Sequence, residues 1–333
     1  MFYNLLAGMV FFESNLLTET LTAFFILAGV LLFVTYRSIS TGWKMILLAL
    51  ATGVALSLAG LVRPLFFFLP VWFLIFIWIS QPGSIKEKLP ALVAYVIGPI
   101  LLLGGWLAYM RGAFHTISPS AMTGYNMVQH TGGFFELLPD EYAPIRDTYI
   151  KYRDTQIAER GSQVNTIWGA IPELQEVSGL GFYDLSREMQ RLSWQLIVDH
   201  PDRYLQNVVK GWFNFWKAPV YWRPEMVSYP WVEPIFGAWA LIGRGIGLAA
   251  NLIFILLSAS LILFSKVRKP LKLTISLMAI AGMVWFISVM QTLLDHGDNP
   301  RFLIPLQIIV VLVVVVILWH GWTLLRKRER ESP

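Results

Sequence analysis

Long apolar runs constrain this chain more than any other feature. A helix that crosses a bilayer needs about 20 mainly apolar residues, because each residue adds about 1.5 Å of rise. Hydrophobic residues make up 56% of the 333 positions and charged residues only 14%, a balance that excludes an ordinary soluble domain. We therefore predict an all-α polytopic membrane protein with about seven full transmembrane helices: Leu17–Tyr36, Met45–Val62, Pro64–Ser80, Pro90–Met110, Ile246–Phe264, Leu271–Leu294 and Phe302–Leu325.

The first apolar segment, Met1–Phe12, is too short to cross a bilayer. It lacks the basic region of a signal peptide, so it is either an interfacial segment or the end of a partial helix. We favour the partial helix, with its beginning outside this sequence.

Basic residues mark every second connection between the apolar runs. Such residues lie on the cytoplasmic side when they are counted over short loops. This pattern predicts a cytoplasmic C-terminal tail and places the intervening connections outside. The net charge of +5 does not indicate a nucleic-acid partner, because topology explains the basic clusters. The basic residues that mark the cytoplasmic side are Arg37, Lys44, Lys86, Lys88, Lys266, Arg268, Lys269, Lys272, Arg326, Lys327, Arg328 and Arg330.

The pattern divides the chain into three parts: residues 1–110 and 236–333 carry transmembrane helices, and residues 111–235 form an extracytoplasmic, mainly helical domain. Apolar positions at three- and four-residue spacing predict helices over Pro139–Arg160 and Tyr183–Val198, and an aromatic stripe follows over Arg203–Trp216. Such a stripe is typical of a core or an interfacial belt. An arginine in hydrocarbon is costly, so we expect the span to begin after Arg244 and Phe236–Gly245 to lie along the outer interface.

Several ionisable residues fall at the outer ends of the predicted helices. Arg63 and Glu19 lie in or beside apolar runs, where charge is costly and is usually functional. Each also has a plain structural explanation, since Glu19 suits a helix N-terminus and Arg63 can extend toward water. The last outer turn places four ionisable residues within seven positions: Asp295, His296, Asp298 and Arg301.

This arrangement suits sugar transfer from a polyprenyl-phosphate carrier, whose phosphate lies at headgroup level. Arg63 and Arg301 are candidates to bind the phosphate and stabilise the charge left when the glycosidic bond breaks. His296 is a candidate for phosphate contact or proton handling, and Glu13 or Glu19 for general base.

Asp295 and Asp298 would line the same site. Their spacing is poor support for a metal, and the chain has no cysteine and no zinc-type ligand spacing, so we predict no metal and no cofactor.

Short motifs resemble a known family. Gly60-Leu61-Val62-Arg63-Pro64, and above all the stretch from Gly297 to Leu306 with its Arg-Phe-x-x-Pro ending, resemble bacterial GT-C membrane glycosyltransferases. The similarity is closest to the branch like dolichyl-phosphate-mannose protein mannosyltransferases. It implies a bacterial inner-membrane enzyme that takes a polyprenyl-phosphate-linked sugar donor and a lipid, glycan or protein acceptor.

The chain departs from that family at its start. The family's catalytic aspartate lies in the first outer loop after the first helix, and nothing here precedes Met1–Phe12. The resemblance therefore implies a transferase whose own base is missing from this chain, which would be a truncated product, a fragment of a longer reading frame or a degenerate homologue. The alternatives are a transporter or flippase for lipid-linked sugars and a non-catalytic membrane scaffold.

Overall fold

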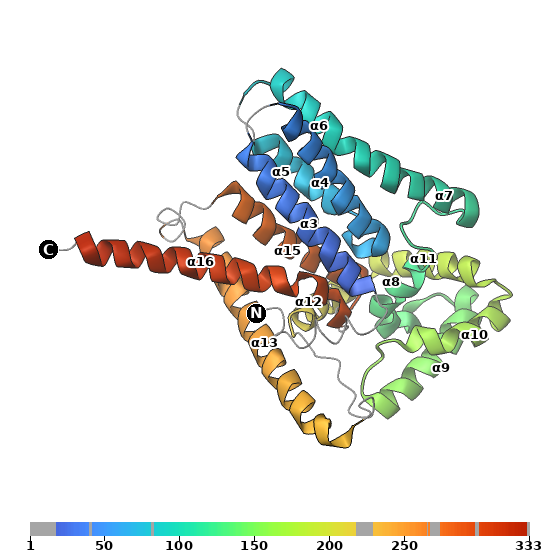
Figure 1. The fold of residues 1–333 in the computed structure, drawn as a ribbon. Coiled ribbons are helices and arrows are strands. Elements are labelled where there is room, and N and C mark those ends of the chain that lie inside the picture. The colour runs from blue at the N-terminus through green and yellow to red at the C-terminus, as the bar shows by residue number, and fades with distance from the viewer. Residues whose placement is uncertain are drawn as a thin grey trace. The chain divides into compact units, whose positions relative to one another are not determined.

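The computed structural model describes residues 18–39, 42–80, 83–217, 229–264, 266, 274–296 and 300–331. Within these ranges the fold is all-helical and no strand forms (Figure 1). The chain divides into two compact units, of which unit 2 comprises Gly105–Phe215 and Val289–Asn299, and unit 1 the remainder.

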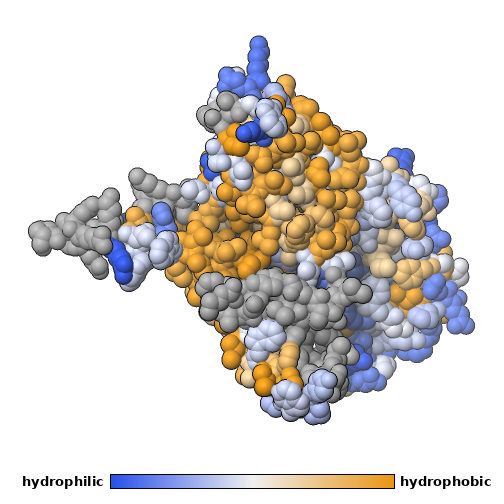
Figure 2. Space-filling view, in the orientation of Figure 1, coloured by the Kyte–Doolittle hydropathy of each residue, from blue (hydrophilic) through white to orange (hydrophobic). Residues whose placement is uncertain are grey.

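Unit 1 contains the long apolar helices. Six helical segments among the described residues are long and apolar enough to cross a bilayer, so the chain is a multi-pass membrane protein. Figure 2 shows apolar residues covering the visible surface of the first helices of this unit. The elements of unit 1 are α3 (Thr18–Ser38), α4 (Trp43–Val62), η1 (Pro64–Phe66), α5 (Leu69–Ser80), α6 (Ile85–Pro99), the π-helical η2 (Ile100–Gly104), η6 (Pro230–Val232), α13 (Glu233–Leu263), most of α15 (Ile275–Leu294), η7 (Pro300–Phe302) and α16 (Ile304–Glu331).

Two predicted spans differ from the structure. The segment Pro64–Ser80 holds a 3₁₀ turn and then α5, whose 12 residues give about 18 Å of helix, too little for a full span. The helix predicted to begin after Arg244 instead begins at Glu233 and runs through that arginine, so Phe236–Gly245 belongs to α13. Its 31 residues give about 46 Å, more than a bilayer core needs.

Small residues bring the helices of unit 1 together. α4 packs against both α3 and α6. At Gly53, an added Cβ would lie 2.2 Å from the carbonyl oxygen of Tyr95, so α4 and α6 touch through their backbones. Close approach at small residues is how helices associate in lipid, where apolar side chains gain little from leaving the solvent.

Unit 2 is a helical bundle with its own core. The predicted helices are present: α9 covers the first and α11 the second, with Leu185, Met189 and Leu192 of α11 fully buried. The core also takes in Tyr125, and the apolar faces of α8, α9, α10 and α11 converge on it. The elements of unit 2 are α7 (Gly105–Phe114), α8 (Thr123–Thr131), η3 (Gly132–Leu137), η4 (Asp140–Tyr142), α9 (Ala143–Arg160), α10 (Thr166–Ser178), α11 (Phe182–Asp199), α12 (Pro201–Phe215) and the last turn of α15.

Candidate functional site

The end of α4 sets the position of Arg63. Proline disfavours helical backbone in the residue before it, and Arg63 precedes Pro64. Arg63 is accordingly extended, with φ −139° and ψ 117°, and its N–H closes the helix by donating to the carbonyl of Ala59 at 3.0 Å. The sharp turn leaves the side chain of Arg63 beside the ends of its neighbouring helices.

Glu19 receives this arginine in the first turn of α3. Its side chain is fully buried, and its Oε1 accepts a hydrogen bond from Nη1 of Arg63 at 2.9 Å. Nε of Arg301 donates to the same oxygen, and Nη1 of Arg63 also donates to the carbonyl of Arg301 at 2.8 Å. We call Glu19, Arg63 and Arg301 the buried ion cluster.

All three members of the buried ion cluster belong to unit 1 and come from helix ends. Glu19 opens α3, Arg63 follows α4, and Arg301 lies in η7 just before α16. Since α3, α4 and α16 are all long enough to span, the cluster is placed near the end of three spans and not near their middles. A charge at that depth is less costly than one at the bilayer centre.

Within the buried ion cluster, two guanidinium groups share one carboxylate. The side chain of Arg63 is 12% exposed and that of Arg301 is 39% exposed, so Arg301 is the member that meets the surroundings. The guanidinium of Arg63 also lies 6.0 Å from the ring centre of Phe302. Oε2 of Glu19 is buried and has no hydrogen-bond partner among the described residues. The arrangement is suited to an anion at Arg301 and a hydroxyl donor at Glu19.

Asp295 and His296 lie in unit 2, whereas Arg301 lies in unit 1. Oδ1 of Asp295 accepts a hydrogen bond from the backbone N–H of His296 at 2.7 Å and lies 3.1 Å from its Nε2. Gly211 of α12 packs against the carbonyl of His296, and an added Cβ would lie 2.7 Å from that oxygen. Glu13 and Asp298 lie outside the described residues.

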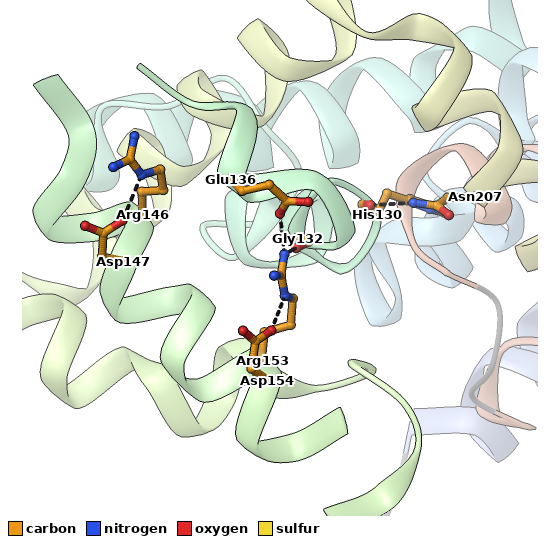
Figure 3. Close-up of polar contacts among 8 residues, drawn as sticks. All are labelled: His130, Gly132, Glu136, Arg146, Asp147, Arg153, Asp154 and Asn207. Carbon is orange, nitrogen blue, oxygen red and sulfur yellow. Dashed lines mark hydrogen bonds and ion pairs between the residues drawn. The ribbon is translucent and has the colours of Figure 1, made fainter. Parts of the chain in front are cut away.

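A second histidine that sequence reasoning missed lies in the same part of unit 2. His130 of α8 is 1% exposed, and its carbonyl accepts a hydrogen bond from Nδ2 of Asn207 at 2.8 Å (Figure 3). Its ring meets that of Tyr204 edge-on, with 5.6 Å between the ring centres. Neither ring nitrogen makes a well-formed hydrogen bond to a described residue, although the backbones of Thr292 and Asp295 lie nearby. No sequence motif indicates that His130 is buried.

Burial decides the charge of both histidines. Loss of solvent lowers the pKa of His130 to about 4 against the weaker opposing effect of the two nearby backbones. Burial, and then the neighbouring His130, lowers the pKa of His296 to about 4. A neutral imidazole is a poor counterion for phosphate, which favours proton handling over phosphate binding for His296.

Two arginines of unit 2, Arg153 and Arg146, bond groups within that unit and stabilise its fold. Arg153 donates to the carbonyl of Gly132 at 3.0 Å and pairs with Glu136 and Asp154, which ties η3 to α9 (Figure 3). Arg146 likewise donates to the carbonyl of Leu138 at 2.9 Å and pairs with acidic neighbours. These contacts hold the connecting segments in place, and each arginine is paired with two carboxylates.

No group of three or more histidine, aspartate or glutamate side chains placed to hold a metal ion occurs in the described part of the chain. Comparison of the chain with family models, with curated proteins and with solved structures gives no match. The resemblance to GT-C glycosyltransferases therefore stays a proposal that depends on short motifs and on the buried ion cluster.

Proposed function

We propose that this multi-pass membrane protein is a glycosyltransferase, or the C-terminal part of one, that takes its sugar from a polyprenyl-phosphate donor. The observation that carries the proposal is the convergence of Arg63 and Arg301 on the buried carboxylate of Glu19. Glu19 is 44 positions from Arg63 and 282 positions from Arg301 in sequence, and both arginines fall within the motifs that resemble the family.

The donor explains why the arginines lie at helix ends. A polyprenyl tail remains in hydrocarbon while its phosphate lies at the headgroup level, which is the depth of a residue at the end of a span. The forked guanidinium of Arg301 can bind two phosphate oxygens and stabilise the charge that develops as the glycosidic bond breaks. Glu19 holds both arginines in position, and the pairing lowers the cost of burying them.

Glu19 is also a candidate proton acceptor. Its Oε1 is taken up by the two arginines, whereas Oε2 has no partner among the described residues. Because Oε2 is buried, an acceptor hydroxyl of a lipid, glycan or protein would reach it only after the residues that cover it move, and would transfer its proton there as it attacks the sugar. The extracytoplasmic location of unit 2 and the bacterial inner membrane as its setting are part of the same proposal.

A transporter is the alternative. Transporters place substrate groups near the bilayer midplane between broken helices. Unit 1 has one irregular span, where Pro99 is followed by the π-helical η2, but that segment is wholly apolar. The ion pairs that the described part of unit 1 does contain lie at the ends of spans, which favours an enzyme at the membrane surface.

The test is transfer of a radiolabelled sugar from a panel of polyprenyl-phosphate sugars by membranes that contain the full-length protein. Arg63→Ala and Arg301→Ala should abolish transfer. Arg37→Ala is the matched control, because Arg37 is also partly buried and bonds Ser276 at 3.1 Å but lies at the opposite end of α3. If all three variants turn over like the wild type, the two arginines have no catalytic role. Absence of transfer by the wild type with every donor would favour the scaffold or the transporter.

A further inference from the structure

Helix α12 has 15 residues, and its side chains form an inner face, an apolar outer face and a basic flank. Tyr204, Gly211 and Phe215 lie on the inner face, where Gly211 and Phe215 are buried. Leu205, Val209 and Phe213 follow one another at four-residue spacing and form a second face. Residues four apart lie on the same side of a helix, so these three make a continuous apolar stripe, which we call the outer stripe.

The inner face of α12 contacts the end of a span. Oη of Tyr204 donates a hydrogen bond to the carbonyl of Leu293 at 2.6 Å, and Gly211 packs against the carbonyl of His296. Leu293 lies in the last turn of α15, which is one of the helices long enough to cross the bilayer and which ends at Leu294. Both contacts lie within unit 2, so α12 lies beside the point where that span ends.

The outer stripe is exposed in the described part of the chain. Leu205 and Val209 are each 55% exposed and Phe213 is 61% exposed. Three large apolar side chains in a row at this exposure are unusual for a surface that faces water and typical of one that meets a membrane or a partner.

Basic residues lie beside the stripe. Lys210 and Arg203 are exposed and lie about 100° and 120° around the helix axis from Val209, at the 100° turn per residue of an α-helix. The acidic residue of this helix, Asp202, lies seven residues before Val209 and therefore about 20° from it around the axis, at the N-terminal end of the outer stripe. There it suits the helix N-terminus, and it is 3.8 Å from Arg203. An apolar stripe with cations on its flank matches the acyl chains and anionic phosphates of a bilayer surface.

We propose that α12 lies in the membrane interface, with the outer stripe among the upper acyl chains and with Arg203 and Lys210 at the level of anionic lipid phosphates. The helix then fixes the height of unit 2 over the bilayer. The outer stripe contacts the lipid, and the inner face of α12 packs against the end of α15 through Tyr204 and Gly211. The proposal is independent of the sugar-transfer function and needs only that α15 spans the membrane.

The absence of native cysteine makes a labelling experiment direct. Four single-cysteine variants, Leu205→Cys, Val209→Cys, Phe213→Cys and the control Glu159→Cys on the exposed face of α9, are labelled with an environment-sensitive fluorophore. The full-length protein is placed in nanodiscs whose lipids carry a nitroxide either near the ester groups or near the chain ends. All four positions are exposed, so labelling should leave the fold intact, which a single symmetric gel-filtration peak would verify.

We expect the three stripe positions to be quenched about two-fold or more strongly than position 159, and more strongly by the shallow nitroxide than by the deep one, as for a helix buried about 5–10 Å into the interface. Replacing zwitterionic lipid with anionic lipid should increase quenching at the stripe, and Lys210→Gln should reduce that increase.

Equal and weak quenching at all four positions would overturn the proposal. So would stripe labels that are silent to lipid nitroxides but show label-to-label coupling between two copies, because the stripe would then be a protein interface. Stronger quenching by the deep nitroxide would also contradict it, because α12 would then be inserted across the bilayer.

Discussion

Replacing Glu19 with glutamine should separate the stability of the buried ion cluster from its affinity for anions. The carboxylate is fully buried and both arginines donate to its Oε1. Removing one partner of a buried ion pair costs about 3–5 kcal/mol. The amide of Glu19→Gln keeps an acceptor oxygen and Arg301 is 39% exposed, so we expect the lower end, about 3 kcal/mol.

The variant Arg301→Ala should lose less stability than Glu19→Gln and more affinity for phosphate. It leaves the Arg63–Glu19 pair intact, and the stability lost at Glu19 is that of one partly exposed charge-assisted hydrogen bond, about 1.5 kcal/mol. Its effect on phosphate affinity is larger, because the guanidinium proposed to bind the phosphate is removed, whereas Glu19→Gln keeps both guanidinium groups. Loss of a charge-assisted bond to phosphate weakens binding about 10- to 100-fold.

Two measurements on the same purified variants test this reasoning. Thermal unfolding in detergent micelles, followed by tryptophan fluorescence, gives the stability order, and titration with undecaprenyl phosphate in nanodiscs gives the affinity order. We expect Glu19→Gln to lower the unfolding midpoint more than Arg301→Ala does, and Arg301→Ala alone to weaken binding strongly. The reasoning is refuted if Glu19→Gln leaves the midpoint unchanged, or if a folded Glu19→Gln protein loses as much affinity as Arg301→Ala.

Three further predictions concern stability. Burial holds the pKa of His130 at about 4, below its usual 6.5, so the unfolded state binds more protons between these values; stability should be complete above about pH 6.5 and fall by about 2–3 kcal/mol toward pH 4. Unfolding midpoints against pH should lose part of this slope in His130→Phe and keep all of it in the exposed control His115→Gln. Gly53→Ala should lower the unfolding midpoint by the equivalent of about 1–3 kcal/mol because its Cβ meets the Tyr95 carbonyl, whereas Gly112→Ala, with open space around it, should not. Tyr204→Phe should cost about 1 kcal/mol through the lost bond to Leu293, and hydrogen exchange at the end of α15 should report it as faster exchange; unchanged exchange would show that the bond does not hold that turn.

Periodicity in the sequence predicts the helices of unit 2 well. Leu185, Met189, Leu192 and Leu196 recur at three- and four-residue spacing, and all four are buried on one face of α11. The pattern works there because that helix faces water on one side and a core on the other. The long apolar runs likewise predict the six helical segments of the described residues that are long enough to cross a bilayer.

Composition is less informative about helix ends inside apolar sequence. The run Pro64–Ser80 is apolar throughout, yet its helix begins only at Leu69, because the first residues form a turn that brings Phe67 against Gly60. The cost of an arginine in hydrocarbon predicts that the helix begins after Arg244, but α13 begins at Glu233 and continues through this residue. The residues from Ile246 to Leu263 alone give about 27 Å, so this arginine can lie within the helix and still outside most of the hydrocarbon.

The candidate site was predictable in part. The cost of charge beside apolar runs singles out Glu19 and Arg63, and the charged last outer turn singles out Arg301. The structure brings these three candidates together at one carboxylate. His130 was not predictable, because a histidine in a short polar helix gives no signal of its own. Only the packing of α12 and the end of α15 around it reveals its burial.

The central claim is that the buried ion cluster recognises a lipid phosphate. The most direct measurement compares undecaprenyl phosphate with undecaprenol, the same chain without the phosphate, for binding to the wild-type protein in nanodiscs. We predict that the phosphate binds at least about 10-fold more tightly and that Arg301→Ala removes the difference, because the charge-assisted bonds are made to the phosphate oxygens. Equal affinity of the wild type for both lipids would contradict the account.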